Sequence, residues 1–241
     1  MNSHSLALLQ SQEIMKRSPY FRGWDAERLS RLAAGAHESI YAKGESLIRK
    51  GEVIKALQVV IIGQVRIFIP LSNGSERVIV LLGRGESFGE ACLIEKEPSP
   101  YQAVASSACR LLSIDGAVLL KEMRQDAILC NRILSVVAKR MLGMLNDTEM
   151  CAQRSSVQRV ACYLMRQRPD DGARSFNIEL PARKRDIAAK MGLTPETFSR
   201  VLASLRQKGA IQVDGRRIQV EDSTVLASLV PDSMSSRTLS T

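Results

Sequence analysis

The spacing of hydrophobic positions changes several times along the chain, and these changes divide it into segments. Residues 5–17 and 25–36 carry apolar side chains at helical spacing, and Asp25 is a suitable N-cap for the second helix. From about residue 38 to 115, short β-branched runs alternate with glycines, which predicts many closely spaced strands. The clearest strands cover residues 59–62, 65–69, 78–82 and 110–114, with a hairpin signal at Ser72-Asn73-Gly74. This pattern predicts a β-sandwich or jelly-roll barrel.

A long helix is predicted at about residues 121–152. One of its apolar lines recurs at alternating intervals of three and four, which is the pattern of a dimerising coiled coil. The predicted dimer seam consists of Cys130, Leu134, Val137, Met141, Met144, Thr148 and Cys151. A second line, formed by Leu129, Ile133 and Val136, is expected to pack on the β domain. The alternative is that both lines form one broad core face.

A helix-turn-helix is predicted further along the chain. A helix that begins near Ser155 and ends near Gln167 precedes it. Residues 183–190 form the first helix of the motif, and Gly192 can take the positive φ that the tight turn needs. Thr194 is a good N-cap for the second helix and Pro195 stands at its N1 position. This second helix is expected to run to Gly209 as its C-cap.

Three polar side chains on the second helix have the chemistry of base reading. Glu196, Ser199 and Arg200 stand at i, i+3 and i+4, so they share one exposed face near the helix N-terminus. Glutamate accepts from cytosine N4, arginine donates to guanine, and serine contacts bases or phosphate. Asp214-Gly215-Arg216 between residues 210–213 and 217–220 predicts a two-stranded wing. Phosphate contacts are expected from Thr194, Thr197, Arg183, Lys184, Arg216 and Arg217.

The distribution of charge agrees with a nucleic-acid partner. The net charge is +9, and residues 153–219 carry 14 Lys and Arg against 6 Asp and Glu, whereas residues 1–152 carry 19 against 16. A basic segment joined to a near-neutral one is typical of a nucleic-acid-binding module with a separate function attached. Aromatic residues are only 4% of the chain, which argues against stacking of single-stranded bases. Double-stranded DNA is therefore the expected partner, with a solvated basic face as the alternative.

Other functional classes find little support in the sequence. The five cysteines have wide spacings without the two-residue gap of a metal site, so we expect free thiols and no metal. The two histidines stand near no catalytic motif, so no enzymatic activity is expected. The chain start lacks the features of a secretory signal and the apolar runs are too short to span a bilayer. We therefore expect a soluble cytoplasmic protein.

Over about residues 20–225 the chain resembles the CRP/FNR family of bacterial transcription regulators. The most specific stretch is Leu193-Thr194-Pro195-Glu196-Thr197-Phe198-Ser199-Arg200, which is similar to the reading helix of the FNR branch. The resemblance implies an α+β fold. Its parts would be a β jelly-roll sensor domain of cyclic-nucleotide-binding type (1–120), a dimerisation helix (121–152) and a winged helix-turn-helix (153–230). Residues 231–241 are rich in Ser and Thr, which predicts a disordered tail. It also implies a homodimer that binds an inverted repeat of TTGA-type half-sites, with RNA polymerase as a partner in activation.

The effector pocket that the resemblance implies departs from the cyclic-AMP branch. Gly89-Glu90 is retained, but residues 97–101 around Ser99 contain no Arg to bind a cyclic phosphate. Met144-Leu145 replace the Thr-Ser pair that reaches the purine in that branch. Without a guanidinium, the phosphate loses a charge-assisted contact, so cyclic AMP is not expected as the effector. Gly89-Glu90 is then interpreted as a structural turn.

Several other effectors remain open. Residues 1–91 contain no Cys, which excludes the four-iron cluster of the oxygen-sensing branch. Haem would need His4 or His37 as an axial ligand. Cyclic di-GMP and thiol oxidation are further candidates, and Cys130 and Cys151 are the thiols on the predicted seam. The alternative function is a ligand-binding regulatory module, for example for cyclic di-GMP, whose main role is not DNA recognition.

Overall fold

The computed structural model describes residues 12–16, 20–72, 74–153, 155–169 and 172–230, with only the backbone described at residues 149–153. The chain forms two compact units, Met1–Gly143 and Met144–Thr241. Residues 12–16 are helical, and the rest of the helix expected at 5–17 lies largely outside the described residues. The predicted tail at 231–241 also lies outside them. The expected second helix is α2 (Ala26–Ala34), and the Asp25 side chain caps it by accepting from the Arg28 amide.

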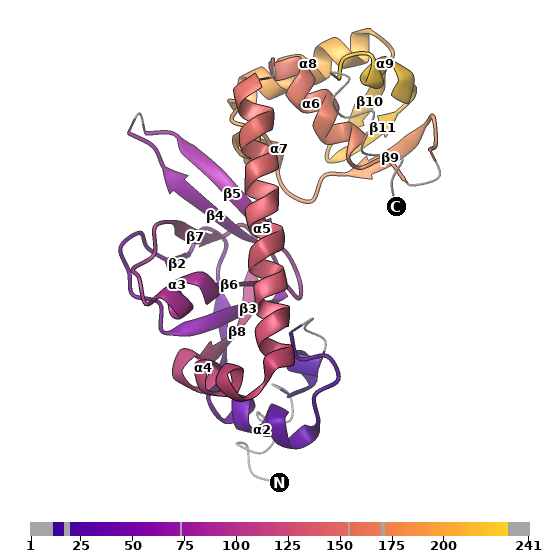
Figure 1. The fold of residues 1–241 in the computed structure, drawn as a ribbon. Coiled ribbons are helices and arrows are strands. Elements are labelled where there is room, and N and C mark those ends of the chain that lie inside the picture. Colours follow the sequence, from indigo (N-terminus) through magenta and orange to yellow (C-terminus); the bar gives the residue numbers. More distant parts are fainter. Residues whose placement is uncertain (1–11, 17–19, 73, 154, 170–171, 231–241) are drawn as a thin grey trace. The chain divides into compact units, whose positions relative to one another are not determined.

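Two four-stranded antiparallel sheets form the first unit (Figure 1). The first sheet has the order β1 (Ala36–Tyr41), β8 (Cys109–Asp115), β3 (Ala56–Ile62) and β6 (Ser87–Phe88). The second has the order β2 (Ser46–Ile48), β7 (Gln102–Ala105), β4 (Val65–Pro70) and β5 (Glu76–Leu82). The four strands predicted from the sequence are thus confirmed within β3, β4, β5 and β8. The hairpin predicted at residues 72–74 is the β4–β5 connection, in which Pro70 pairs with Glu76.

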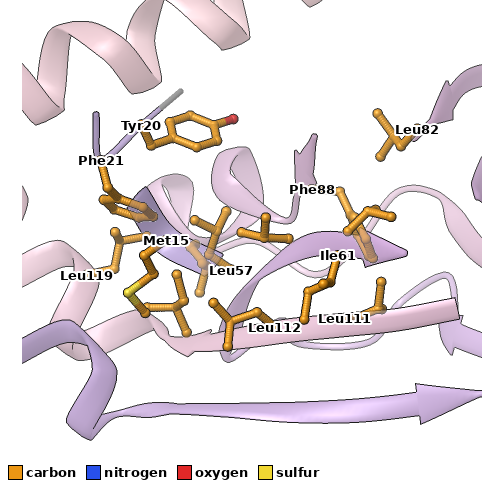
Figure 2. Close-up of a cluster of buried hydrophobic side chains, with 14 of the residues drawn as sticks. Met15, Tyr20, Phe21, Leu57, Ile61, Leu82, Phe88, Leu111, Leu112 and Leu119 are labelled. Atoms are coloured by element: carbon orange, nitrogen blue, oxygen red, sulfur yellow. The ribbon is translucent and has the colours of Figure 1, made fainter. Parts of the chain in front are cut away.

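Apolar side chains from the inner faces of the strands form the core of this unit. Figure 2 shows Leu57 and Ile61 of β3 beside Leu111 and Leu112 of β8. Aromatic side chains near the start of the described chain add to the same cluster, among them the fully buried Phe21. Leu111 and Leu112 are adjacent and therefore point to opposite faces of β8, and both are buried, so this strand is covered on both sides.

The helix predicted at residues 121–152 is wrong in its first part. Two helices occupy the region, α4 (Gly116–Gln125) and α5 (Ala127–Gln153), and they are separated at Asp126. The Asp126 carboxylate accepts hydrogen bonds from the amides of Ile128 (2.8 Å) and Leu129 (3.0 Å), so it caps the long helix. Arg28 of α2 pairs with the other Asp126 oxygen at 3.0 Å, which fixes the break in place.

The second apolar line of α5 packs on the β domain, as the sequence predicted. Leu129 and Ile133 are fully buried in the core cluster, and Val136 is partly buried against it. Val137, one of the predicted seam residues, is also partly buried against this core. The short helix α3 (Glu90–Glu95) follows β6 and was not predicted.

In the described part of the second unit, four helices and a small sheet follow α5, and the second and third of these helices form the helix-turn-helix. They are α6 (Ser156–Met165), α7 (Lys184–Lys190), α8 (Pro195–Gln207) and α9 (Ser223–Ala227), with β9 (Phe176–Glu179), β10 (Ile211–Asp214) and β11 (Arg217–Val220). Ser155 starts α6 as predicted, through a capping box with Gln158. The predicted two-stranded wing is instead a three-stranded sheet in the order β10-β11-β9.

Candidate nucleic-acid interface

The start of α8 is built by its cap. The Thr194 hydroxyl accepts a hydrogen bond from the Thr197 amide (3.2 Å), and Pro195 occupies the first helical position. Gly192 in the preceding turn has φ +65°, as the sequence predicted. The helix ends at Lys208 as C-cap, and Gly209, with φ +68°, follows it, which moves the predicted cap by one residue.

The two faces of α8 have different roles. Phe198, Val201, Leu202 and Leu205 are buried and hold the helix on its unit. Glu196, Ser199 and Arg200 are all exposed, so the structure brings the three predicted base-reading residues together on one solvent face. This separation leaves the polar groups at the helix N-terminus available to an external partner.

Electrostatics prepare these side chains for hydrogen bonding. The backbone N–H of Glu196 itself and the Thr194 hydroxyl lower the pKa of the Glu196 carboxyl, and the positive charge of Arg200 acts in the same direction. The Arg200 guanidinium donates to the Thr197 hydroxyl at 3.3 Å, which orients it along the helix. Glu196 is therefore an ionised acceptor beside a guanidinium donor.

The wing places two arginines on an exposed hairpin. Gly215 has φ +55°, and Asp214 pairs with Arg217 at the end of the ladder. The loop is therefore Gly215-Arg216, and Asp214 belongs to β10 rather than to the predicted turn. Arg216 and Arg217 are exposed, and the Arg216 guanidinium lies 3.4 Å from the Glu179 carboxylate of β9.

The remaining predicted phosphate contacts differ in their availability. Arg183 and Lys184 are half-buried at the start of α7. Thr194 is exposed, but its hydroxyl already serves the cap and donates to the Thr197 hydroxyl at 3.1 Å. Thr197 is half-buried, and its backbone amide is the one that the cap satisfies.

One residue of this region could not be identified from the sequence. Arg159 of α6 donates to the carbonyl oxygens of Met191 (3.2 Å) and Gly192 (3.4 Å) in the turn between α7 and α8. It satisfies carbonyls at the end of α7, where a helix leaves acceptors without internal partners. The partners are 32 and 33 residues away along the chain, so no local pattern reveals the contact.

Around Gly89 and Glu90, the predicted effector pocket contains an internal ion pair. Gly89 has φ +99°, and a Cβ there would lie 3.2 Å from the Ala56 carbonyl oxygen, so the turn requires glycine. Glu90 is 2% exposed, and its carboxylate pairs with the Arg140 guanidinium of α5. Arg140 also donates to the Ser87 carbonyl, and the Tyr20 hydroxyl is hydrogen-bonded to the Ser87 hydroxyl.

The other predicted pocket residues are arranged differently. Ser99 is buried, and its hydroxyl donates to the Tyr101 carbonyl (2.9 Å) and accepts from the Tyr101 amide (3.3 Å). Met144 and Leu145 are exposed on α5. His37, one of the two histidines that a haem would need as an axial ligand, is exposed on β1, whereas His4 lies outside the described residues.

The predicted dimer seam is largely exposed. Leu134 is 63% and Met141 54% exposed, and Cys130, Met144 and Thr148 are exposed as well. The side chain of Cys151 lies outside the described residues. Three further apolar side chains that the strict heptad line omitted are also exposed on α5, namely Ile128, Leu142 and Leu145. The uncovered face of α5 is thus wider than predicted.

Two protein-family models match the chain in its two parts. The "Cyclic nucleotide-binding domain" model matches residues 38–126, and the "Crp-like helix-turn-helix domain" model matches residues 158–229. No helix among the described residues is long and apolar enough to cross a membrane.

Several of the similar proteins are transcription regulators. The cyclic AMP receptor protein of Thermus thermophilus is 27% identical over 212 residues, which is 88% of this chain and 96% of the relative. The nitrogen fixation regulation protein FixK of Azorhizobium caulinodans is 24% identical and covers 82% of this chain and 81% of the relative. The structure of FixK2 from Bradyrhizobium japonicum has a TM-score of 0.69 at 25% identity and covers 81% of this chain and 98% of that chain. With its β-sheet sensor domain, long helix and helix-turn-helix, this chain belongs to the CRP/FNR family of DNA-binding transcription regulators.

Proposed function

We propose that this regulator is a homodimer that binds an inverted repeat of TTGA-type half-sites. The observation that carries the proposal is the exposed group of Glu196, Ser199 and Arg200 on the capped N-terminal end of α8. Arg200 would donate two hydrogen bonds to guanine, Glu196 would accept from cytosine N4, and Ser199 would contact the T. Arg183, Lys184, Arg216 and Arg217 would position the unit by binding phosphates.

Replacement of Arg200 tests this assignment. Arg200→Ala should abolish the preference for a TTGA palindrome over a scrambled duplex, because a bidentate contact to guanine contributes about 1–3 kcal/mol in each half-site. Fluorescence anisotropy with both duplexes measures the preference. As the control, Arg216→Ala should weaken binding to both duplexes alike. An unchanged preference in Arg200→Ala would show that α8 is not the reading helix.

The uncovered face of α5 supports the proposed dimer. Leu134 and Met141 expose apolar surface, whereas Leu129 and Ile133 of the same helix are buried. A second copy of α5 would bury this surface, and the two reading helices would then contact half-sites about one DNA turn apart. A regulator of this kind acts on chromosomal DNA in the cytoplasm, with RNA polymerase as its partner in activation and without catalytic activity of its own.

The signal is proposed to be an effector other than cyclic AMP. Arg140 already neutralises the Glu90 carboxylate, and no Arg stands at residues 97–101 to bind the phosphate. An anionic phosphate in such a partly desolvated site is disfavoured. Calorimetry with millimolar cyclic AMP should therefore show no saturable heat, and DNA affinity should not change. A micromolar affinity for cyclic AMP would contradict this proposal and return the chain to the cyclic-AMP branch. Haem as the effector is tested separately, by an absorption spectrum of the protein with added haem.

A further inference from the structure

We propose that a small groove beside the reading face of α8 binds a DNA backbone phosphate that flanks the bases read by the protein. The inference rests on the proposed DNA-binding function and adds a contact to it. The groove has a volume of about 220 Å³ and is lined by Lys184, Ser199, Leu202, Ala203, Arg206 and Val213. This volume is several times the ~30 Å³ of a water molecule, so a phosphate group has room to enter.

The charge of the groove is entirely positive. Lys184 from α7 and Arg206 from α8 are its two charged lining residues, and none of the lining residues is acidic. Within the described part of the chain, neither of these cations forms an ion pair. Other cations of the same unit do, for example Lys190 with Asp147 and Arg174 with Asp222. Two unpaired cations beside an apolar floor favour an anion from outside the chain.

The position of the groove identifies which anion it would meet. Ser199, one of the proposed base-reading residues, lines one end, and Arg206 follows seven residues later on the same helix. Seven residues are two helical turns, or roughly 10 Å. This is the rise of about three nucleotides of one strand, at roughly 3.4 Å each. Arg206 would therefore reach a phosphate beyond the bases that Ser199 and Arg200 contact.

Ala203 keeps the groove open between these two ends. It lies one turn after Ser199 and about one turn before Arg206, and its side chain is exposed. A longer side chain here would fill the floor and separate Lys184 from Arg206. The size of residue 203 and the charge of residue 206 can therefore be tested independently.

The first test removes the charge. In the full-length protein, Arg206→Gln should make the salt dependence of DNA binding shallower by about 0.9 per groove, or about 1.8 for a dimer. Between 50 and 200 mM salt, the affinity ratio of wild type to variant should then narrow about tenfold. The matched control is Lys208→Gln, which removes an exposed charge from the same helix end outside the groove. Equal effects of the two variants would overturn the proposal.

The second test identifies the DNA phosphate that is bound and asks whether binding needs the open space at Ala203. In a series of duplexes, the phosphates that flank the half-site are replaced one at a time by an uncharged methylphosphonate. The affinity of the wild-type protein should fall at one such position per half-site. The DNA affinity of Arg206→Gln should be unaffected by the methylphosphonate at that position alone. Ala203→Leu should lose affinity without a change of charge, whereas Ala203→Ser should not. The absence of any such position, or full affinity in Ala203→Leu, would contradict the groove as the site.

The two proposals fail separately. If wild type showed no preference for the TTGA palindrome, the proposed specificity would be wrong, but the difference in salt dependence between Arg206→Gln and Lys208→Gln would still appear on scrambled duplexes. If the preference were intact and that difference absent, only the groove would be refuted. A wild-type protein that binds no duplex at all would refute both.

Discussion

Tyr20 is the residue that connects the start of the described chain to the ion pair of the sensor domain. Its hydroxyl bonds to Ser87 and lies 3.5 Å from the Glu90 carboxylate, which Arg140 also binds. Burial of the ring, with a smaller contribution from the Glu90 charge, raises the pKa of Tyr20 from 10.0 to about 12. The neutral hydroxyl is therefore favoured by folding.

A raised tyrosine pKa has a defined consequence for stability. The contribution of Tyr20 is complete below pH 10, the ordinary pKa, and is lost as pH rises through about 12. Tyr20→Phe should lower stability at pH 8 by about 0.5–1.5 kcal/mol, through the lost hydrogen bond, and should reduce the loss between pH 8 and pH 11. Urea unfolding at the two pH values measures both effects.

Tyr163 provides the contrast in the second unit. Its hydroxyl is buried without a hydrogen-bond partner among the described residues, and burial alone raises its pKa to about 12. Tyr163→Phe should therefore reduce the loss of stability between pH 8 and pH 11 without lowering stability at pH 8. If Tyr20→Phe lost as much stability between pH 8 and pH 11 as wild type, this would contradict the buried position of the Tyr20 hydroxyl.

At the scale of single residues, the sequence predicts local chemistry better than long-range contacts. The spacing of Glu196, Ser199 and Arg200 places them on one helix face, since a helix has a fixed period. The pair of Glu90 and Arg140 joins positions 50 residues apart, and Tyr20 is 70 residues from Glu90. Each of these side chains has an ordinary local context, so only the folded chain reveals their contact.

At the scale of elements, the connection between β3 and β4 depends on one glycine. Gly63 has φ +93°, and a Cβ there would lie 2.3 Å from the Ala108 carbonyl oxygen and 2.8 Å from the Cys109 sulfur. Both the backbone conformation and the close approach of β8 exclude a side chain. The run of strands therefore needs glycine at this position.

Gly63→Ala should destabilise the protein by about 3 kcal/mol, from roughly 1–2 kcal/mol of backbone strain and about 1–3 kcal/mol of overpacking. Thermal or urea unfolding measures the loss. Gly44→Ala is the matched control, because Gly44 has φ +90° and a Cβ there would have no atom within 4 Å. Gly44→Ala should be destabilised only by the backbone strain, roughly 1–2 kcal/mol. Equal losses in the two variants would show that contact with Ala108 carries no cost.

The elements that the sequence missed have identifiable causes. The sequence predicted one helix at about residues 121–152, where the chain ends α4 at Gln125 and begins α5 at Ala127. Asp126 is itself an N-cap signal, and its pairing with Arg28 decides the break. The strand β9 pairs with β11 residues that lie 38 to 44 positions later in the chain, and its four residues are too short for a clear period.

At the scale of the whole molecule, the uncovered face of α5 sets the expected assembly. Met141→Glu should convert the dimer to monomer, since an unpaired charge buried in an apolar interface costs about 3–5 kcal/mol. Sedimentation velocity measures the change. Lys139→Glu, an acidic replacement at an exposed polar position of the same helix, should remain dimeric. A dimer that survives Met141→Glu would place the two-fold interface elsewhere.

The division of labour on α8 also bears on how such a regulator acquires new target genes. Its buried face, from Phe198 to Leu205, carries the packing, while Glu196, Ser199 and Arg200 are exposed. Exposed substitutions usually change stability by less than about 0.5 kcal/mol. After gene duplication, these three positions can therefore diverge without unfolding the protein. With the base-reading role proposed above for these positions, a few substitutions on α8 change the DNA target of a copy while its β-sheet domain is retained.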